Sequence, residues 1–256
     1  MKPDRTMADL RTLEELAEGN TVLHRLHPGA KLLAALLYLV CLMSLERHAL
    51  IRVTPFLFYP VLMGSIAELP AGLLFRRTVP ALPFAFFAGL SNLVFEGGTA
   101  GMLSFTVLMA RTFLCVSAVM ILIGTTPFPA LTGAMKQLHV PVVIADLLEM
   151  LYRYLSVVTE EAEQMLTAFR LRSGGRVWPD PREYAPMISQ LFFRSADRAE
   201  RIYDAMQCRL YRGAGTLSGT AGKWRRRDYV FFLLAAGTSV LFAAADIPGF
   251  LGSIAR

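Results

Sequence analysis

Apolar residues are concentrated in five segments of the chain, each close to the length of a transmembrane helix. A helix needs about 20 mostly apolar residues to cross the hydrocarbon core of a bilayer. The prolines of the third segment fall in its first turns, where they disturb a helix least, whereas those of the second segment interrupt it. The pattern therefore predicts five spans, Ala30–Leu45, Ala49–Leu69, Thr78–Phe95, Ala100–Ile123 and Tyr229–Ala245.

A different pattern fills the stretch between the fourth and fifth predicted spans. From Val143 to Phe169, apolar residues recur at steps of three and four, which is typical of one face of an α-helix. Acidic residues at Glu160, Glu161 and Glu163 fall on the other side, and we interpret them as a solvated face. The pair Gly174-Gly175 predicts the end of this helix, because glycine favours the backbone turn that closes a helix.

A second amphipathic helix follows after three prolines that are expected to prevent the first from resuming, Pro179, Pro181 and Pro186. Its apolar face runs from Ile188 to Leu210, and it is expected to end near Gly213. A shorter helix is predicted at about Pro129–Leu138. A helix with one apolar face is not stable alone in water, so these helices must pack on each other, on the bilayer or on another protein.

Composition and charge favour a membrane protein with a definite orientation. Hydrophobic residues make up 54% of the 256 residues and charged residues 18%, against about 25% in soluble domains. With the N-terminus inside, most of the lysines and arginines lie in cytoplasmic segments, as the positive-inside rule requires. The sequence therefore predicts a cytoplasmic N-terminus and a cytoplasmic position for the amphipathic helices.

Together these patterns predict an all-α membrane protein with about five transmembrane helices and a cytoplasmic module of two long amphipathic helices and one short one. Residues 1–29 are expected to form a cytoplasmic N-terminal segment, and residues 30–123 a four-helix transmembrane bundle. Residues 124–228 are expected to form the cytoplasmic module. Residues 229–256 are expected to form a C-terminal transmembrane helix with a short tail.

Motifs that carry chemistry are missing from the sequence. It contains no phosphate-binding GxxxxGK[ST] loop, no GxSxG elbow and no HExxH pair. The cysteines Cys41, Cys115 and Cys208 have no CxxC spacing, which argues against a disulfide framework or a zinc site. Only His24 and His27 share a helical spacing, and interfacial loop residues are the favoured interpretation over a metal pair. We therefore expect no catalytic residue, metal or cofactor.

Arg111 lies inside the fourth predicted span, where an arginine is costly, by about 2.5–3.5 kcal/mol at the centre of a bilayer. One interpretation is a polar anchor that holds spans together or binds a partner. The other is an arginine near the interface, whose long side chain reaches the polar headgroups. The sequence leaves both interpretations open.

Arginines also cluster where the two amphipathic helices end. The first closes with Arg170-Leu171-Arg172-Ser173 and the second with Cys208-Arg209-Leu210, followed by Arg212. Cations favour helix C-termini through the helix dipole, by about 0.3–1 kcal/mol each, and this effect alone could explain them. Two parallel occurrences favour docking into acidic grooves, for which the planar guanidinium is well suited.

Several short segments of the chain are similar to one family. They are His27–Leu33, Thr125–Pro127 with Leu138–Pro141, Tyr152–Tyr154 with Glu160-Glu161, and Arg194–Arg201 leading into Ala205–Arg209. On these segments the chain resembles the transmembrane T component of energy-coupling factor (ECF) transporters, an ABC-type importer class. It is most similar to the CbiQ branch, which is associated with cobalt uptake. The likeness runs from about residue 20 to residue 215.

The resemblance implies a multi-pass permease subunit of the bacterial or archaeal plasma membrane. Its implied partners in the lipid bilayer and cytoplasm are two CbiO-like ABC ATPase subunits and a CbiM-like membrane S component, with or without a small CbiN-like subunit. ATP hydrolysis would take place on the partners, so the chain is expected to be non-catalytic. The two long amphipathic helices correspond to the coupling helices of the family, and no nucleic acid is expected to bind.

The family also implies where the ATPases dock. Two short motifs, typically Ala-Arg-Gly or close variants, end the coupling helices and insert an arginine into a groove on each ATPase. Here they read Leu171-Arg172-Ser173 and Cys208-Arg209-Leu210, which points to Arg172 and Arg209. Because both motifs depart from the family's small flanking residues, Arg170 and Arg212 stay as alternates.

The resulting hypothesis is a subunit that couples ATP hydrolysis to cobalt import, with nickel or a vitamin as alternative cargo. A different ABC permease and a membrane enzyme are the next alternatives. A membrane-anchored nucleic-acid binder would explain the basic segments Arg194–Arg201 and Lys223–Arg227. The interleaved acids Asp197, Glu200 and Asp204 argue against it, because they interrupt any track for phosphates.

Overall fold

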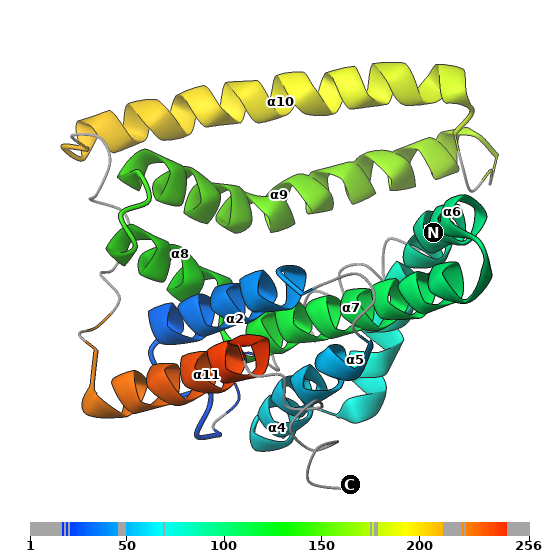
Figure 1. The fold of residues 1–256 in the computed structure, drawn as a ribbon. Coiled ribbons are helices and arrows are strands. Elements are labelled where there is room, and N and C mark those ends of the chain that lie inside the picture. The colour runs from blue at the N-terminus through cyan, green and yellow to red at the C-terminus, as the bar shows by residue number, and fades with distance from the viewer. Residues whose placement is uncertain are drawn as a thin grey trace, which may run out of the picture. The chain divides into compact units, whose positions relative to one another are not determined.

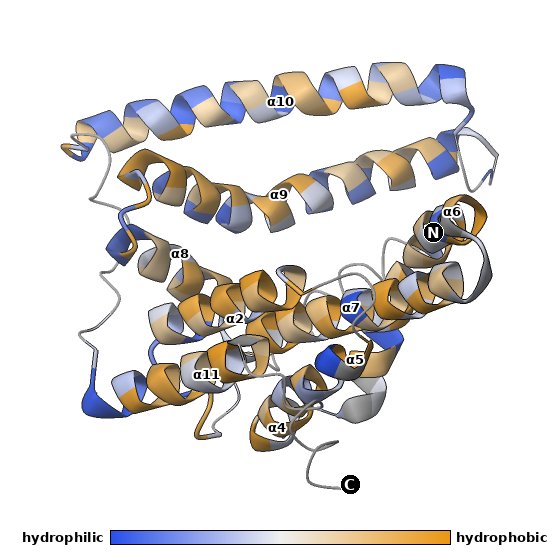
Figure 2. Ribbon diagram, in the orientation of Figure 1, coloured by the Kyte–Doolittle hydropathy of each residue, from blue (hydrophilic) through white to orange (hydrophobic). Residues whose placement is uncertain are grey.

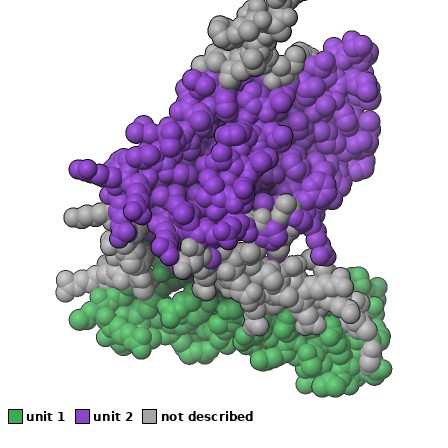
Figure 3. Space-filling model, turned by 90° about the horizontal axis from the view of Figure 1, so that it is seen from below, with its two compact units in different colours: residues 1–6, 135–220 green, residues 7–134, 221–256 purple. Residues whose placement is uncertain are grey.

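The computed structural model describes residues 17, 19, 21–45, 50–68, 70–174, 176, 179–211, 222 and 224–244 (Figure 1). These residues form helices joined by turns, with no strand among them, which confirms the all-α fold class. The chain divides into two compact units (Figure 3). Unit 1 comprises Met1–Thr6 and Met135–Thr220, and unit 2 comprises Met7–Ala134 and Ala221–Arg256.

Unit 2 contains the apolar helices, which are mainly hydrophobic, although Ala71–Thr78 and the start of Arg226–Ala244 include hydrophilic residues (Figure 2). Its two longest apolar helical segments, Leu74–Phe95 and Gly98–Thr125, have the length and composition to cross a membrane. Two shorter apolar helical segments, Pro28–Met43 and Thr54–Ile66, accompany them in the described part of the chain. The number of spans and their orientation stay predictions.

One proline in each of the second and third predicted spans, Pro55 and Pro80, lies in a 3₁₀ turn that divides the span, whereas Pro60 and Pro83 lie inside helices. The second consists of α3 (Leu50–Val53), a 3₁₀ turn η1 (Thr54–Leu57) and α4 (Phe58–Ile66). Proline removes a backbone donor and fixes its own φ, so the tighter turn forms where Pro55 enters. In the same way, Pro80 lies in the 3₁₀ turn η2, between the two helical parts of the third predicted span. The third predicted span begins within α5 (Ala71–Thr78) and continues through η2 (Val79–Ala81) into α6 (Leu82–Glu96).

Helix α7 (Gly98–Thr125) is the centre of unit 2 and packs against α2 (Pro28–Met43), α4, α5 and α6. Its close approach to α6 depends on Gly101, where a Cβ atom would lie 3.3 Å from the carbonyl oxygen of Asn92. Helix α11 (Arg226–Ala244) packs against α2. In the core, the hydroxyl of Tyr38 donates to the carbonyl oxygen of Phe56 across 2.9 Å.

The predicted amphipathic helices are present with shifted ends. The short one is α8 (Phe128–Gln137), and the first long one is α9 (Val142–Arg172). The second, α10 (Pro181–Cys208), mixes hydrophilic and hydrophobic residues along its length (Figure 2). Helices α9 and α10 lie side by side and run in opposite directions (Figure 1).

The predicted end of the second long helix was wrong, whereas the first long helix ends at Arg172 and does not resume at the prolines. Pro181 is the first residue of α10 and Pro186 lies inside it. A proline at the first position fits a helix well, and one near the start removes only a single backbone bond. At the other end, α10 stops at Cys208 rather than near Gly213, because Leu210 already adopts the left-handed conformation that closes a helix.

Candidate functional site

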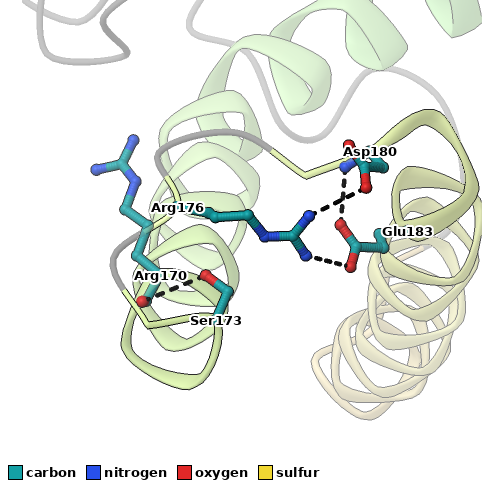
Figure 4. Close-up of polar contacts among 5 residues, drawn as sticks. All are labelled: Arg170, Ser173, Arg176, Asp180 and Glu183. Carbon is teal, nitrogen blue, oxygen red and sulfur yellow. Dashed lines mark hydrogen bonds and ion pairs between the residues drawn. The ribbon is translucent and has the colours of Figure 1, made fainter.

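The C-terminal end of α9 is closed by the glycine that the sequence indicated. The N–H of Ser173 donates to the carbonyl oxygen of Phe169 across 2.9 Å, and Gly174 follows with a φ of 67°. The Ser173 hydroxyl also donates to the carbonyl oxygen of Arg170 across 3.4 Å (Figure 4). Glycine takes the left-handed conformation without steric cost, so this end of the helix is unstrained.

The C-terminal end of α10 has the same kind of closure without a glycine. The N–H of Leu210 donates to the carbonyl oxygen of Gln207, and the N–H of Tyr211 donates to that of Met206, both across 3.0 Å. This pair of bonds is the Schellman motif, and Leu210, with a φ of 62°, occupies the position that usually holds glycine. Leu210, which departs from the family pattern, therefore has a strained backbone conformation.

The two predicted docking arginines occupy different positions in these helix ends. Arg172 is the last residue of α9, two positions before the left-handed residue, whereas Arg209 is the C-cap of α10, directly before Leu210. Both guanidinium groups are exposed, and neither makes a hydrogen bond or ion pair with the residues that the structure describes. They are therefore available to an external partner.

The flanking residues differ in how far they are exposed. The side chain of Arg170 is half-buried and interacts within the chain. Leu171 is 81% exposed and Leu210 is 78% exposed, so each arginine has a protruding leucine beside it. Cys208 is exposed and Ser173 is half-buried. The alternate residue Arg212 lies outside the described residues.

Arg176 fixes the turn between α9 and α10, close to Arg172 in sequence. Its guanidinium donates to Asp180 Oδ2 across 3.0 Å and to Glu183 Oε1 across 2.7 Å (Figure 4). Hydrogen bonds to Glu183 and then to Asp180 raise the pKa of Arg176 above its ordinary value. The same guanidinium lies 5.7 Å from the ring of Phe169 on α9, a cation–π distance. Arg176 thus joins the end of one helix to the start of the next.

The sequence patterns did not predict this turn, although part of its signal is present in the sequence. Asp180 and Glu183 form a capping box, in which each side chain accepts from the backbone N–H of the other residue. An Asp followed three residues later by Glu, just before an apolar-periodic stretch, is the sequence signature of a helix start. The part played by Arg176 could not be read, because it depends on the path of the loop.

The interpretation of the three glutamates as a solvated face was wrong for Glu161. Its side chain is only 19% exposed, and it forms ion pairs with Arg194 at 2.5 Å and with Arg198 at 3.3 Å, both from α10. These contacts hold the two long helices together near their middles. Two of the basic residues that suggested a nucleic-acid binder, Arg194 and Arg198, therefore take part in the packing of unit 1.

The antiparallel arrangement separates the two candidate docking ends. Arg172 ends α9 beside the turn to α10, whereas Arg209 lies at the far end of α10 (Figure 1). At about 1.5 Å per residue, the 28 residues of α10 span roughly 42 Å. Unit 1 therefore presents two exposed arginine ends, one at each end of a single helical hairpin.

Arg111 belongs to unit 2, whereas Arg172 and Arg209 belong to unit 1. Its Nη2 atom donates to the carbonyl oxygen of Leu45 across 2.8 Å, just after the last residue of α2. It also borders a cavity of about 280 Å³ whose other lining residues are Ala88, Asn92, Ser104, Val107 and Leu108. The contact joins α7 to the end of α2, where a cation is favoured by the helix dipole.

Comparison with known proteins gives one family for most of the chain. The family model "Cobalt transport protein", CbiQ, matches residues 19–218. Among similar proteins is the energy-coupling factor transporter transmembrane protein EcfT of Ruminiclostridium cellulolyticum, 25% identical over 90% of this chain and 94% of that protein. EcfT of Bacillus selenitireducens is 26% identical over 93% of this chain and 97% of that protein.

A further relative is named as a fused protein. The putative fused cobalt transport protein CbiMQ of Methanocorpusculum labreanum is 26% identical over 64% of this chain and 28% of its own length. The EcfT relatives, by contrast, are matched over nearly their whole length. The chain therefore belongs to the CbiQ family and is a T component of the energy-coupling factor transporters, a membrane component that works in a complex with other subunits.

Proposed function

We propose that the chain is the coupling subunit of its transporter, docked through Arg172 and Arg209 onto two ABC ATPase subunits. The observation that carries the proposal is the pair of exposed, uncommitted guanidinium groups at opposite ends of one antiparallel hairpin. The 28 residues of α10 span roughly 42 Å, so ends on opposite sides of this hairpin can reach two separate partners. A guanidinium presents several donors in a fixed plane, which suits an acidic groove.

The leucines beside the arginines extend this docking surface. Leu171 and Leu210 protrude from the two helix ends and offer apolar area next to each charge. An interface with an apolar contact beside a charged hydrogen bond excludes water from that bond and strengthens it. Each docking end is thus an arginine with an adjacent leucine.

Motion of the ATPases would then reach the S component through the apolar surface of the hairpin. On α9, the residues Val143, Ile144, Leu147 and Leu151 are exposed, as is Phe192 on α10. Such a surface is rarely left in water, and it suits a membrane partner. ATP binding and hydrolysis change the distance between the ATPases, and helices docked on both must follow.

The proposed cargo is cobalt. The matching family model carries the description of a cobalt transport protein, and one relative is named as a fused cobalt transport protein. Nickel or a vitamin is the alternative, because the S component selects the cargo and the EcfT relatives bear no cargo in their names.

Charge reversal at the two helix ends tests the docking. We expect Arg172→Glu and Arg209→Glu each to weaken capture of the ATPase subunits by about 10- to 100-fold, since a charged hydrogen bond contributes roughly 1.5–3 kcal/mol. The measurement is co-purification of the ATPases with the tagged chain from membranes. Arg170→Glu and Arg212→Glu, run in parallel, test the alternate registers.

The matched control is Arg201→Glu, which reverses an exposed arginine in the body of α10. It should leave capture unchanged. If both end variants retain the ATPases as well as this control does, the docking assignment is wrong. A separate measurement addresses the cargo: ATP-dependent uptake of Co²⁺, Ni²⁺ and vitamins by liposomes that contain the complete complex. Uptake of a vitamin without Co²⁺ would overturn the cobalt assignment.

A further inference from the structure

A buried polar cluster in unit 2 joins three helices that are far apart in sequence. Its members come from the start of α2, the end of α7 and the start of α11, and α2 packs against both other helices (Figure 1). Each is less than a tenth exposed: His27, Lys31, Thr125, Thr126 and Asp228. Burying so many polar groups is unfavourable unless they bond to one another, and here they do.

Lys31 holds the end of α7. Its Nζ atom donates to the carbonyl oxygen of Thr125 across 2.7 Å and to the hydroxyl of Thr126 across 3.3 Å. The third donor of the ammonium reaches the carbonyl oxygen of His24 at 3.4 Å. The last carbonyls of a helix have no partner within it and carry partial negative charge, so the ammonium satisfies them directly.

His27 and Asp228 hold the start of α11. The N–H of His27 donates to Asp228 Oδ1 across 2.8 Å, and Asp228 Oδ2 accepts from the N–H of Arg225 across 2.7 Å. The Nε2 atom of His27 donates to the carbonyl oxygen of Gly222 across 2.6 Å, while its Nδ1 atom accepts from the N–H of Gly29 across 3.0 Å. These roles fit the neutral ring with the proton on Nε2.

These bonds lie before the polypeptide leaves unit 2 and directly after it returns. After Thr126 the chain enters α8 and continues into unit 1 at Met135. It returns to unit 2 at Ala221, and the next residue, Gly222, is the one bonded to His27. One short segment, His27–Lys31, therefore fastens the departing and the returning chain.

We propose that the cluster of His27, Lys31, Thr125, Thr126 and Asp228 is the joint through which unit 1 drives the transmembrane bundle, with Lys31 and Asp228 as positioning residues. The proposal rests on the coupling function proposed above. Displacement of the cytoplasmic hairpin pulls on α8 and on the segment before α11. Because the residues just before α8 and the start of α11 are bonded to the start of α2, the bundle moves with them.

The test is the ratio of uptake to ATP hydrolysis in the complete complex, with its ATPases and S component, reconstituted in liposomes. Lys31→Met keeps the length of the side chain and removes its three donors. We expect the complex to assemble and to hydrolyse ATP within twofold of the unmodified rate, and uptake per ATP to fall at least tenfold. Thr126→Val, a milder change that removes one acceptor, should lower the ratio by two- to fivefold.

The matched control is Tyr38→Phe, which removes a buried bond from a side chain to a carbonyl oxygen elsewhere in unit 2. It should leave uptake per ATP unchanged even if the complex becomes less heat-stable. Unmodified ratios in both Lys31→Met and Thr126→Val would overturn the joint, and so would equal losses of uptake and hydrolysis. Neither result bears on the docking of Arg172 and Arg209, which the capture experiment tests separately.

Discussion

The N–H of Tyr211 donates to the carbonyl oxygen of Met206 across 3.0 Å, and this bond closes α10 around a leucine in the left-handed conformation. For a residue with a Cβ atom, this conformation is disfavoured by about 1–2 kcal/mol. Leu210 is exposed, so no burial of its side chain offsets the strain. A strained residue thus stands directly beside Arg209.

Replacing this leucine with glycine should stabilise the end of α10. Leu210→Gly relieves the strain, although the more flexible unfolded chain offsets part of the gain, which leaves about 0.5–1 kcal/mol. The amides of Leu210 and Tyr211 should then exchange with deuterium roughly two- to fivefold more slowly. Hydrogen-exchange mass spectrometry of the peptide that covers the end of α10 measures this.

The control for that prediction is Leu171→Gly, at the equally exposed leucine of α9. Leu171 lies within the helix, where glycine is less favourable than leucine by nearly 1 kcal/mol. This variant should accelerate exchange at the end of α9. Slower exchange in both variants, or faster exchange in both, would contradict the assignment of strain to Leu210.

The pairing of Glu161 with α10 predicts a specific weakness of the hairpin. Glu161→Gln keeps the shape of the side chain but removes the charge that binds Arg194 and Arg198, at a cost of about 1 kcal/mol. Peptides from the middle of α10 should exchange about fivefold faster. Glu160→Gln, at the exposed neighbour, should change nothing, and equal effects of the two variants would refute the pairing.

Lys136 and Asp146 connect the end of α8 to the start of α9 and predict a non-additive pair of variants. Their charged atoms are 2.5 Å apart, and the side chains are only 14% and 5% exposed. Removing one partner strands a buried charge, which costs roughly 3–5 kcal/mol. Asp146→Leu should therefore lower the thermal unfolding midpoint in detergent more than Lys136→Met combined with Asp146→Leu does. A double variant at least as unstable as the single one would contradict this.

Arg111→Leu distinguishes an anchor between helices from an arginine that merely reaches the interface. Leucine is favoured over arginine by about 3 kcal/mol at the centre of a membrane span, so insertion should not suffer. Loss of the bond to the carbonyl oxygen of Leu45 should nevertheless lower the thermal midpoint. An unchanged midpoint would favour the interfacial interpretation. Insertion is measured by protease protection in membranes, and the midpoint by thermal unfolding in detergent.

Local signals predicted the amphipathic helices. The spacing of apolar residues after Val143 and the glycine at Gly174 indicated the course and the end of α9, because both reflect interactions within a few residues. Pro55 in the second predicted span also marked the place where the helix breaks, whereas Pro60 lies inside α4. The all-α fold class follows from signals of this kind.

The rest depended on contacts that sequence spacing does not encode. Glu161 looked solvated because its helix face is polar, but its environment is set by α10, a separate element. Leu210 adopts a conformation that its residue type disfavours, so no propensity rule would have ended α10 there. Arg172 and Arg209 were singled out by sequence, whereas their different positions relative to the helix caps required the structure.

The antiparallel packing of α9 and α10 limits what movements the module can transmit. Arg176 fastens the hairpin at its turn and Glu161 at its middle, while backbone bonds set the length of α10. The separation between the helix ends that carry Arg172 and Arg209 is therefore nearly constant. Under the proposed docking, two ATPase subunits that approach each other would not shorten the hairpin, so their closure would tilt or slide it, and a change of angle would reach the membrane.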